Sequence, residues 1–232
     1  FDVVRGALYR LQSSGTTVSS SQSGTVTAFG SDGFSIGNNA EVNANTASYV
    51  SWNWKAGTSF SNDASSTSVG SIDSSGSVST TSGFSIIKWS GANATSTVAH
   101  GLGVAPKVLL VKSLANTTTW MVQHAGIGNA KEIYLNNDSA AGNSTAWNST
   151  SPTTTVFTVT GGAGDGVNHS GDYIAYCFAE VKGFSKFGSY IGNANANGAF
   201  VYTGFKPAWI LIKSTGAGES WQILDNKRST FN

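Results

Sequence analysis

The chain has one place where the side-chain types of a hydrolase triad follow one another closely, at His169, Ser170 and Asp172. A triad needs a nucleophile, a base and a carboxylate that converge in one geometry, and near neighbours in a glycine-containing turn cannot easily do so. The corresponding turn earlier in the chain reads Ala44-Asn45, so the histidine does not recur. We interpret this segment as a polar turn and predict a protein without catalytic residues.

Metal-ligating residue types are few in this sequence. His100, His124 and His169 lack the spacing of a zinc site. Cys177 is the single cysteine, so it cannot form a disulfide within the chain, and we expect it to be a small packed residue. The run Gly161–Gly166 is similar to a calcium-binding nonapeptide, but stacked calcium sites need several copies. The sequence therefore predicts neither a metal nor another cofactor.

Two kinds of residue could act on or bind a polysaccharide. A glycosidase needs two carboxylates about 5 to 10 Å apart in a cleft, and the 12 acidic residues are scattered without an obvious pair. Aromatic rings beside Asn and Asp can stack on sugars. Three tryptophans near strand ends or in loops are the candidate glycan contacts: Trp89, Trp120 and Trp147. Four aromatic residues that recur on strand faces are instead expected in the core: Trp52, Trp54, Tyr176 and Phe178.

Composition predicts the class of fold that must position these residues. The 232 residues (23.9 kDa) include 28 Gly and 7 Trp, and Gly, Ser, Thr and Asn together fill nearly half of the chain. The aromatic content excludes a disordered chain, the shortage of strong helix formers excludes a helical bundle, and the low proline count excludes collagen. The remaining class is an all-β protein with polar, turn-rich connections.

Charge and hydropathy exclude two kinds of partner. The net charge is +1 and Lys and Arg form no cluster, so nucleic acid is not an expected partner. No apolar stretch approaches the roughly 18 residues that a membrane span requires. We therefore expect no membrane insertion.

Several segments have the composition of strands, which are runs rich in Val, Ile, Thr and aromatics. The apolar run Lys107–Lys112 has charged ends and predicts a central strand buried on both faces. Val50, Trp52 and Trp54 alternate with polar residues, the pattern of a half-buried strand. Two further strands are expected at Trp120–Gln123 and Val156–Val159.

The sequence also repeats itself with two different offsets. At an offset of about 101 residues, Gly83-Phe-Ser85 recurs as Gly183-Phe-Ser185, Pro106–Lys112 as Pro207–Lys213, and Trp120–Val122 as Trp221–Ile223. At an offset of about 123 to 125 residues, Phe34–Ile36 recurs as Phe157–Val159 and Tyr49–Trp54 as Tyr173–Phe178. Phe1–Arg5 is also similar to Leu224–Arg228. The chain is therefore built from related units.

The repeat predicts four parts. Residues 1–55 match the back part of a unit, 56–82 form a Ser/Gly/Thr-rich linker or loop, 83–182 form a complete unit, and 183–232 match the front part of a further unit. We favour a fragment of a longer tandem array; the alternative is that 1–55 and 183–232 combine, within the chain or between chains. The expected fold is all-β, with tandem, mainly antiparallel, jelly-roll-like β-sandwich units of about 100 residues.

Six motifs resemble those of tandem-repeat structural proteins of marine tailed bacteriophages, including cyanophages. They are Gly83-Phe-Ser-Ile-Ile87, His100-Gly-Leu-Gly-Val-Ala-Pro106, Tyr49-Val-Ser-Trp-Asn-Trp-Lys55, Tyr173-Ile-Ala-Tyr-Cys-Phe178, Gly183-Phe-Ser-Lys-Phe-Gly188 and Phe200-Val-Tyr-Thr-Gly-Phe-Lys-Pro207. The resemblance covers essentially the whole chain. It implies a tail-fibre-like virion protein whose repeat domain has no established biochemical activity.

The expected function is that of a non-enzymatic virion protein in a tail fibre or another surface appendage, with roles in assembly and host-surface adhesion. Its expected partners are other virion proteins and copies of itself, with trimers common in fibres, and a host-surface glycan is a further candidate. A lectin-like glycan-binding module is the first alternative and a capsid decoration protein the second. A polysaccharide depolymerase ranks last, because no pair of carboxylates is evident.

Overall fold

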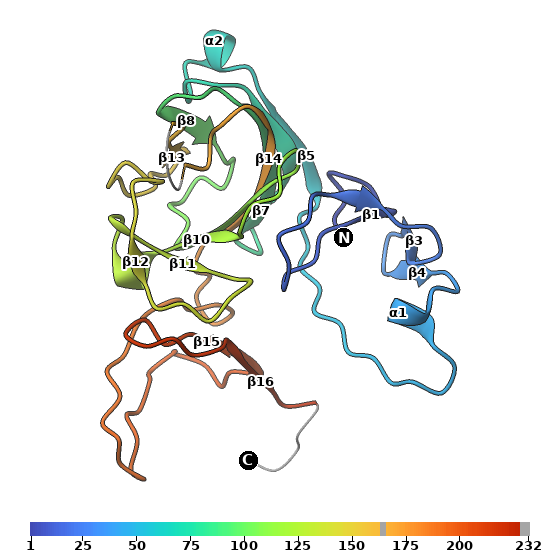
Figure 1. The fold of residues 1–232 in the computed structure, drawn as a ribbon, viewed down its shortest axis with the longest axis vertical. Helices are drawn as coiled ribbons and strands as arrows, with labels where there is room; N and C mark the ends of the chain where they lie inside the picture. The colour runs from blue at the N-terminus through green and yellow to red at the C-terminus, as the bar shows by residue number, and fades with distance from the viewer. Residues whose placement is uncertain (163–165, 228–232) are drawn as a thin grey trace.

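The computed structural model describes residues 1–162 and 166–227 and confirms the all-β class (Figure 1). Its largest element is an antiparallel sheet of eight strands in the order β12-β11-β10-β9-β14-β7-β6-β5. These strands are β5 (Thr58–Asn62), β6 (Ser74–Ser79), β7 (Phe84–Gly91), β9 (Val108–Ser113), β10 (Met121–His124), β11 (Lys131–Tyr134), β12 (Gly142–Asn143) and β14 (Gly171–Phe178). Among the described residues, no helix is long and apolar enough to cross a membrane.

The central strands β9 and β14 are buried on both faces because their side chains alternate between an inner and an outer core. The inner residues are Leu109, Val111, Tyr173, Ala175 and Cys177, and the outer ones are Val108, Leu110, Ile174, Tyr176 and Phe178. The predicted central strand at Lys107–Lys112 is therefore confirmed as β9. The strand expected at Trp120–Gln123 is confirmed as β10, displaced by one residue.

A second layer covers the inner face of the main sheet. It consists of β8 (Ser96–Ala99) paired antiparallel with β13 (Val156–Val159), the strand that the sequence predicted with these same bounds. Val98 and Phe157 are fully buried between the layers. The Trp89 ring stacks on Tyr173, with the ring centres 5.5 Å apart. The two layers pack face to face as in a sandwich, with β8 and β13 across the core from β14 (Figure 1).

Residues 56–82 form part of the main sheet, so their prediction as a linker or loop is wrong. β5 pairs with β6, and β6 pairs with β7 in the body of the sheet. The short helix α2 (Ala64–Thr67) connects the two strands and begins at Asp63, whose carboxylate accepts the Ser65 and Ser66 amides. Ladder hydrogen bonds join backbone groups, so Ser- and Gly-rich strands can pair although their composition is that of a loop.

Residues before the main sheet form two small hairpins and one short helix. These elements are β1 (Tyr9–Arg10), β2 (Ser20–Ser21), β3 (Val26–Phe29), β4 (Phe34–Ile36) and α1 (Ala40–Asn43). Residues 44–57 contain neither helix nor strand, so the strand predicted at Val50–Trp54 is wrong. Trp52 and Trp54 are 39% and 41% exposed instead of buried in a core. A half-buried strand needs neighbours that complete its ladder and cover one face, which its own sequence cannot supply.

Residues after the main sheet form one antiparallel hairpin of β15 (Trp209–Ile212) and β16 (Gln222–Asp225). The 3₁₀ turn η1 (Ala125–Ile127) directly follows β10 in the main sheet. Figure 1 shows the N-terminal segment (blue) and the β15–β16 hairpin (red) on different sides of the sandwich. Both segments pack on the outer face, at separate places: Leu11 against the cluster that contains Ile174, and Trp221 against the cluster that contains Val122. The division into repeat units stays a prediction.

Candidate functional site

The triad-like segment makes its hydrogen bonds and its ion pair with other residues, not among His169, Ser170 and Asp172. The Asp172 carboxylate accepts the Ser90 hydroxyl at 2.7 Å and pairs with the Lys88 ammonium at 2.9 Å. These two partners hold the pKa of the Asp172 carboxyl below its usual value. The backbone amide of Ser170 donates to the Asn93 side chain. His169 and Ser170 form a bend directly before β14, whereas Asp172 lies within β14, where its carboxylate forms an ion pair with Lys88 of the neighbouring strand β7.

The side chains of His100, His124 and Cys177 are held within the fold by burial or by hydrogen bonds. The His100 ring is fully buried, with Nε2 3.2 Å from the Thr153 carbonyl, and burial lowers the pKa of this ring. His124 Nδ1 accepts the Gly126 amide at the start of η1, and burial lowers the pKa of His124 as well. Cys177 is fully buried, and burial raises the pKa of its thiol to about 12. The thiol is therefore protonated and unreactive at neutral pH.

No group of three or more His, Cys, Asp or Glu that could hold a metal ion occurs among residues 1–162 and 166–227. Part of the Gly161–Gly166 run, residues 163–165, lies outside the described residues. A cavity of about 230 Å³ lies at one end of the sandwich, beside His169 and Ser113. Ligand pockets usually occupy about 300 to 1,000 Å³, so this cavity is small for a substrate.

The three candidate glycan tryptophans are core residues, which corrects the prediction for them. Trp89 is 2% exposed, Trp120 is 4% exposed and Trp147 is fully buried. The indole N–H of Trp89 donates to the Asn168 side chain at 3.0 Å inside the core. A ring that stacks on a sugar must present a free face, so none of the three serves that purpose. Sequence position near a strand end did not distinguish a buried from an exposed ring.

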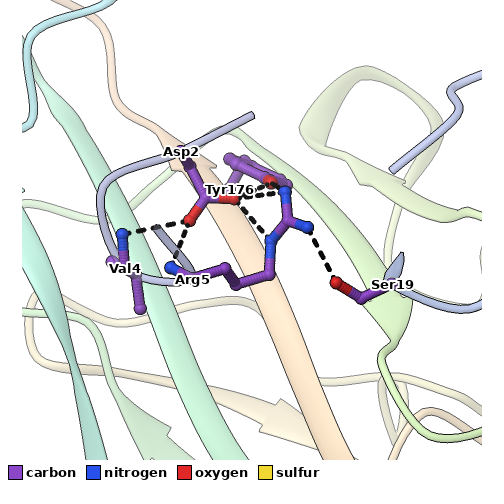
Figure 2. Close-up of polar contacts among 5 residues, drawn as sticks. All are labelled: Asp2, Val4, Arg5, Ser19 and Tyr176. Atoms are coloured by element: carbon purple, nitrogen blue, oxygen red, sulfur yellow. Dashed lines mark hydrogen bonds and ion pairs between the residues drawn. The ribbon is translucent and has the colours of Figure 1, made fainter. Parts of the chain in front are cut away.

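The most prominent buried polar cluster joins the N-terminus to the outer face of the main sheet (Figure 2). The Asp2 carboxylate pairs with the Arg5 guanidinium at 2.6 Å, and these side chains are 1% and 4% exposed. Tyr176 on β14 donates its hydroxyl to Asp2 at 2.7 Å. Arg5 also donates to the Ser19 hydroxyl at 3.0 Å, beside β2. The cluster therefore fixes the β1–β2 segment against β14.

The electrostatics of this cluster suit attachment better than catalysis. Burial, reinforced by the Asp2 charge, raises the pKa of Tyr176 far above its usual value, so the phenol stays a hydrogen-bond donor. The Asp2 carboxylate also accepts the backbone amides of Val4 and Arg5, at 3.1 and 2.9 Å. A fully partnered ion pair in a closed site has no free acid or base to offer a substrate. Its residues lie far apart in sequence, so only the similarity of Phe1–Arg5 to Leu224–Arg228 could have drawn attention to them.

A second attachment lies nearby, which we call the first joint: Trp120 and Lys112 with the carbonyls of Gln12 and Thr16. The Trp120 indole N–H donates to the Gln12 carbonyl at 2.8 Å. Lys112 points to the outer face and donates its ammonium to the Thr16 carbonyl at 3.1 Å and to the Ser113 carbonyl at 3.2 Å. Burial lowers the pKa of Lys112 to about 8.

The β15–β16 hairpin is attached through equivalent contacts, which we call the second joint: Trp221 and Lys213 with the carbonyls of Tyr134 and Asp138. The Trp221 indole N–H donates to the Tyr134 carbonyl at 2.7 Å. Lys213 donates to the Asp138 carbonyl at 3.0 Å and to the Ser214 carbonyl at 2.9 Å. Lys213 and Trp221 lie 101 residues after Lys112 and Trp120, the donors of the first joint. The acceptor carbonyls of Tyr134 and Asp138 lie 122 residues after those of Gln12 and Thr16.

The same arrangement, a Trp and a Lys that donate to backbone carbonyls of another segment, occurs at both joints. Each joint uses side-chain donors of one segment and backbone carbonyls of another, so the acceptor residues can change without loss of the contact. The partner of each donor is another stretch of polypeptide that is itself related to the main sheet. The site that the geometry supports is therefore a pair of equivalent attachment contacts between segments of one all-β chain.

Comparison with known proteins identifies the family. The family model described as "Domain of unknown function (DUF7483)" matches residues 1–232, so the chain belongs to this family. No curated protein matches the chain. No solved structure matches it either.

Proposed function

We propose that this protein is a non-enzymatic structural component of a phage particle, in a tail fibre or another surface appendage. The proposal takes its biological setting from the resemblance of six ordered motifs to virion repeat proteins. It takes its molecular role, assembly through related β units, from the contacts of the described residues. The expected location is the surface or tail of the particle.

The observation that carries the assembly role is the recurrence of the joint. Trp120 and Trp221 donate to carbonyls at equivalent positions, as do Lys112 and Lys213. A contact that recurs with the repeat can be added again with each further unit, which is how solenoid and array proteins grow in one direction. Such arrays suit the spacing of a binding tip from a particle.

The proposed partners are copies of the same chain and other virion proteins. A large part of the apolar surface is open to such partners, including Ile191 and Phe200, which are both 90% exposed. Exposed apolar side chains of this kind can be buried by association with another protein surface. Host-surface adhesion remains part of the proposal, but without support from Trp89, Trp120 and Trp147, whose rings are buried.

The test is to locate the protein in particles of a phage that encodes it. Mass spectrometry of gradient-purified particles is expected to detect the chain, and gold-labelled antibodies raised against it are expected to bind the tail or its fibres. Labelling of the capsid surface would replace the appendage with a capsid decoration role. Absence of the chain from purified particles would refute the proposal.

A further inference from the structure

The N-terminal hairpin reproduces one edge of the main sheet. In β1–β2, Tyr9 pairs with Ser21 and Arg10 with Ser20. In β11–β12, the residues 122 positions later pair in the same register: Lys131 with Asn143 and Glu132 with Gly142. The closing hydrogen bond from the residue 22 amide to the residue 8 carbonyl recurs between residues 144 and 130. The β1–β2 hairpin is thus a structural copy of β11–β12.

The C-terminal hairpin reproduces the centre of the main sheet. In β9–β10, Val108 pairs with His124 and Val111 with Met121. In β15–β16, the residues 101 positions later pair in the same register: Trp209 with Asp225 and Ile212 with Gln222. The hydrogen bond from the residue 125 amide to the residue 107 carbonyl recurs between residues 226 and 208. The copied hairpins therefore come from complementary parts of one sheet.

Residues 1–55 and residues 183–227 contain copies of different strands of the sandwich, so each segment lacks strands whose copies the other contains. Residues 1–55 contain the counterparts of β11 and β12 and, in sequence, those of β13 and β14. Residues 183–227 contain the counterparts of β9 and β10 and, in sequence, that of β7. In the main sheet, β9 lies between β10 and β14. Its copy β15 is paired with β16 alone in a two-stranded sheet, so within residues 1–162 and 166–227 its other edge has no strand partner.

The sequence copy of β14 is the Tyr49–Trp54 segment, which forms no strand and is exposed. Tyr49 and Val50 are 48% and 52% exposed, and Ile210 on β15 is 40% exposed. An open strand edge with apolar side chains is a template for pairing with another chain. The exposed segment and the open edge have the sequences of two strands that pair in the main sheet.

The geometry points to assembly of this chain with a second copy of itself, in which the Tyr49–Trp54 segment of one copy pairs antiparallel with β15 of another. The register follows from β14 and β9, where Ala175 pairs with Val111 and Phe178 with Val108. Transferred to the copies, Ser51 lies opposite Ile212 and Trp54 opposite Trp209. Within one chain, the Trp52 and Trp54 rings contact the Trp209 ring edge to face, with centres 6.4 and 5.9 Å apart, but the segment forms no strand pair with β15.

A second copy is the chosen occupant because the two hairpins of one chain are bound elsewhere. A complete sheet would place β1 beside β16, as β11 lies beside β10. In this chain the residues after β1 are bound to the outer face, where Leu11 packs in the cluster around Ile174 and the Gln12 carbonyl accepts the Trp120 indole N–H, and β16 follows Trp221, which donates to the Tyr134 carbonyl. Pairing with another copy completes the strand set without breaking either joint. Reciprocal exchange would close a dimer, whereas one-way addition would extend a filament.

Cysteine cross-linking with the whole 232-residue chain tests this register. One sample contains the Ser51→Cys variant, a second contains the Ile212→Cys variant, and the two are mixed and oxidised; Cys177 is retained because it is fully buried. The matched control mixes Val50→Cys with Ile212→Cys, since a shift of one residue turns the side chain to the opposite face of the strand. We expect about tenfold more covalent dimer from the Ser51 mixture than from the Val50 mixture.

Sedimentation of the unmodified chain and cross-linking of a double variant show whether the Tyr49–Trp54 segment pairs with β15 of another copy or with β15 of its own chain. The unmodified chain is expected to sediment as a dimer or larger species that dissociates on dilution. A monomer at all concentrations, with a disulfide formed inside the single chain of the double variant Ser51→Cys/Ile212→Cys, would overturn the inference in favour of closure within one chain. Equal cross-linking of both mixtures would overturn the register. The inference deepens the assembly role proposed above, but this test is made in solution, so it can fail while the protein is still found in particles.

Discussion

The hairpins β9–β10 and β15–β16 have the same register but very different surroundings. Both strand pairs follow a glycine with positive φ, Gly103 at 71° and Gly204 at 81°. Leu109 on β9 is 1% exposed, whereas the equivalent Ile210 on β15 is 40% exposed. The difference is that β9 has β14 along its second edge and a packed layer on each face. Local sequence therefore specifies the hairpin, and its neighbours determine how much of it is buried.

The two joints also differ in how far their side chains are exposed to solvent. At the first joint, Lys112 is 1% exposed and Trp120 4% exposed, and the Asp2–Arg5 ion pair adds a buried attachment nearby. At the second joint, Lys213 and Trp221 make equivalent hydrogen bonds while half-buried. Hydrogen bonds are worth more where water is excluded. The first joint is therefore expected to contribute more stability than the second.

The largest predicted difference concerns the matched pair Leu109 and Ile210. Leu109→Ala should lower the free energy of unfolding by about 4 kcal/mol, because it leaves a cavity in the inner core. Ile210→Ala should lower it by about 1 kcal/mol, because the side chain is already partly in water. Urea denaturation followed by tryptophan fluorescence measures both values. Equal losses would mean that β15 is as enclosed as β9 in solution.

Loss of the buried ion pair should release the N-terminal segment. Arg5→Met leaves the Asp2 carboxylate buried beside Tyr176 without its counter-charge, a change that costs about 3 kcal/mol. Hydrogen exchange of the amides in residues 1–21 should therefore accelerate about 100-fold. The amides of β15–β16 are the internal control and should keep their rates, because that hairpin is attached through the second joint. Acceleration confined to residues 1–5 would contradict the anchoring role.

How far the sequence predicts this structure depends on which groups make each contact. The strands at Lys107–Lys112 and Val156–Val159 were recognisable because their side chains are the ones buried. β5 and β6 were missed because their pairing uses backbone groups, and residues such as Ser75 and Gly76 have the composition of a loop. Composition counts side chains and so cannot detect a ladder that is independent of them.

The tryptophans show a second limit of prediction from sequence: whether a side chain is buried depends on which other segments cover it. Trp52 and Trp54 share the pattern of Tyr176 and Phe178, but they remain 39% and 41% exposed, although the Trp54 ring contacts Phe178 at the outer face. Trp120 is 4% exposed: its indole N–H donates to the carbonyl of Gln12, a residue 108 positions away, and its ring contacts Tyr176. A pattern within one strand cannot report which distant segment will cover it. In the sequence, the repeat offsets of about 101 and of about 123 to 125 residues are the signal that relates such distant segments.

The two joint lysines should differ in how stability depends on pH. Lys112 has a folded pKa of about 8, below its unfolded value, so between pH 8 and about 10.5 the unfolded chain keeps a proton that the folded chain has released. Stability from this group therefore rises with pH across that range. Relative to Lys112→Met, the wild-type protein should gain about 2 kcal/mol between pH 8 and 10.5.

The control for this pH effect is Lys213→Met. Burial lowers the pKa of Lys213 in the same direction, but the side chain remains half-exposed, so solvent screening should leave only a small pH-dependent difference from wild type. Urea denaturation at a series of pH values gives both differences, and the contribution of Cys177 cancels because every protein in the series contains it. A larger pH effect at Lys213 than at Lys112 would reverse the assignment of the more buried joint.

The smallest predicted effects test the two indole hydrogen bonds themselves. Trp120→Phe keeps an aromatic ring in place but removes the donor to the Gln12 carbonyl, which should cost about 1 kcal/mol, because hydrogen bonds of this kind contribute about 0.5 to 1.5 kcal/mol. Trp221→Phe removes the equivalent donor at the half-buried second joint, where water can replace it, so the loss should be no more than about half as large. Hydrogen exchange of β1–β2 and of β15–β16 separates the two effects, since each substitution should loosen only the hairpin that its own joint attaches. If both substitutions loosened both hairpins, the joints would be coupled through the outer face, and the two attachments would act as one interface.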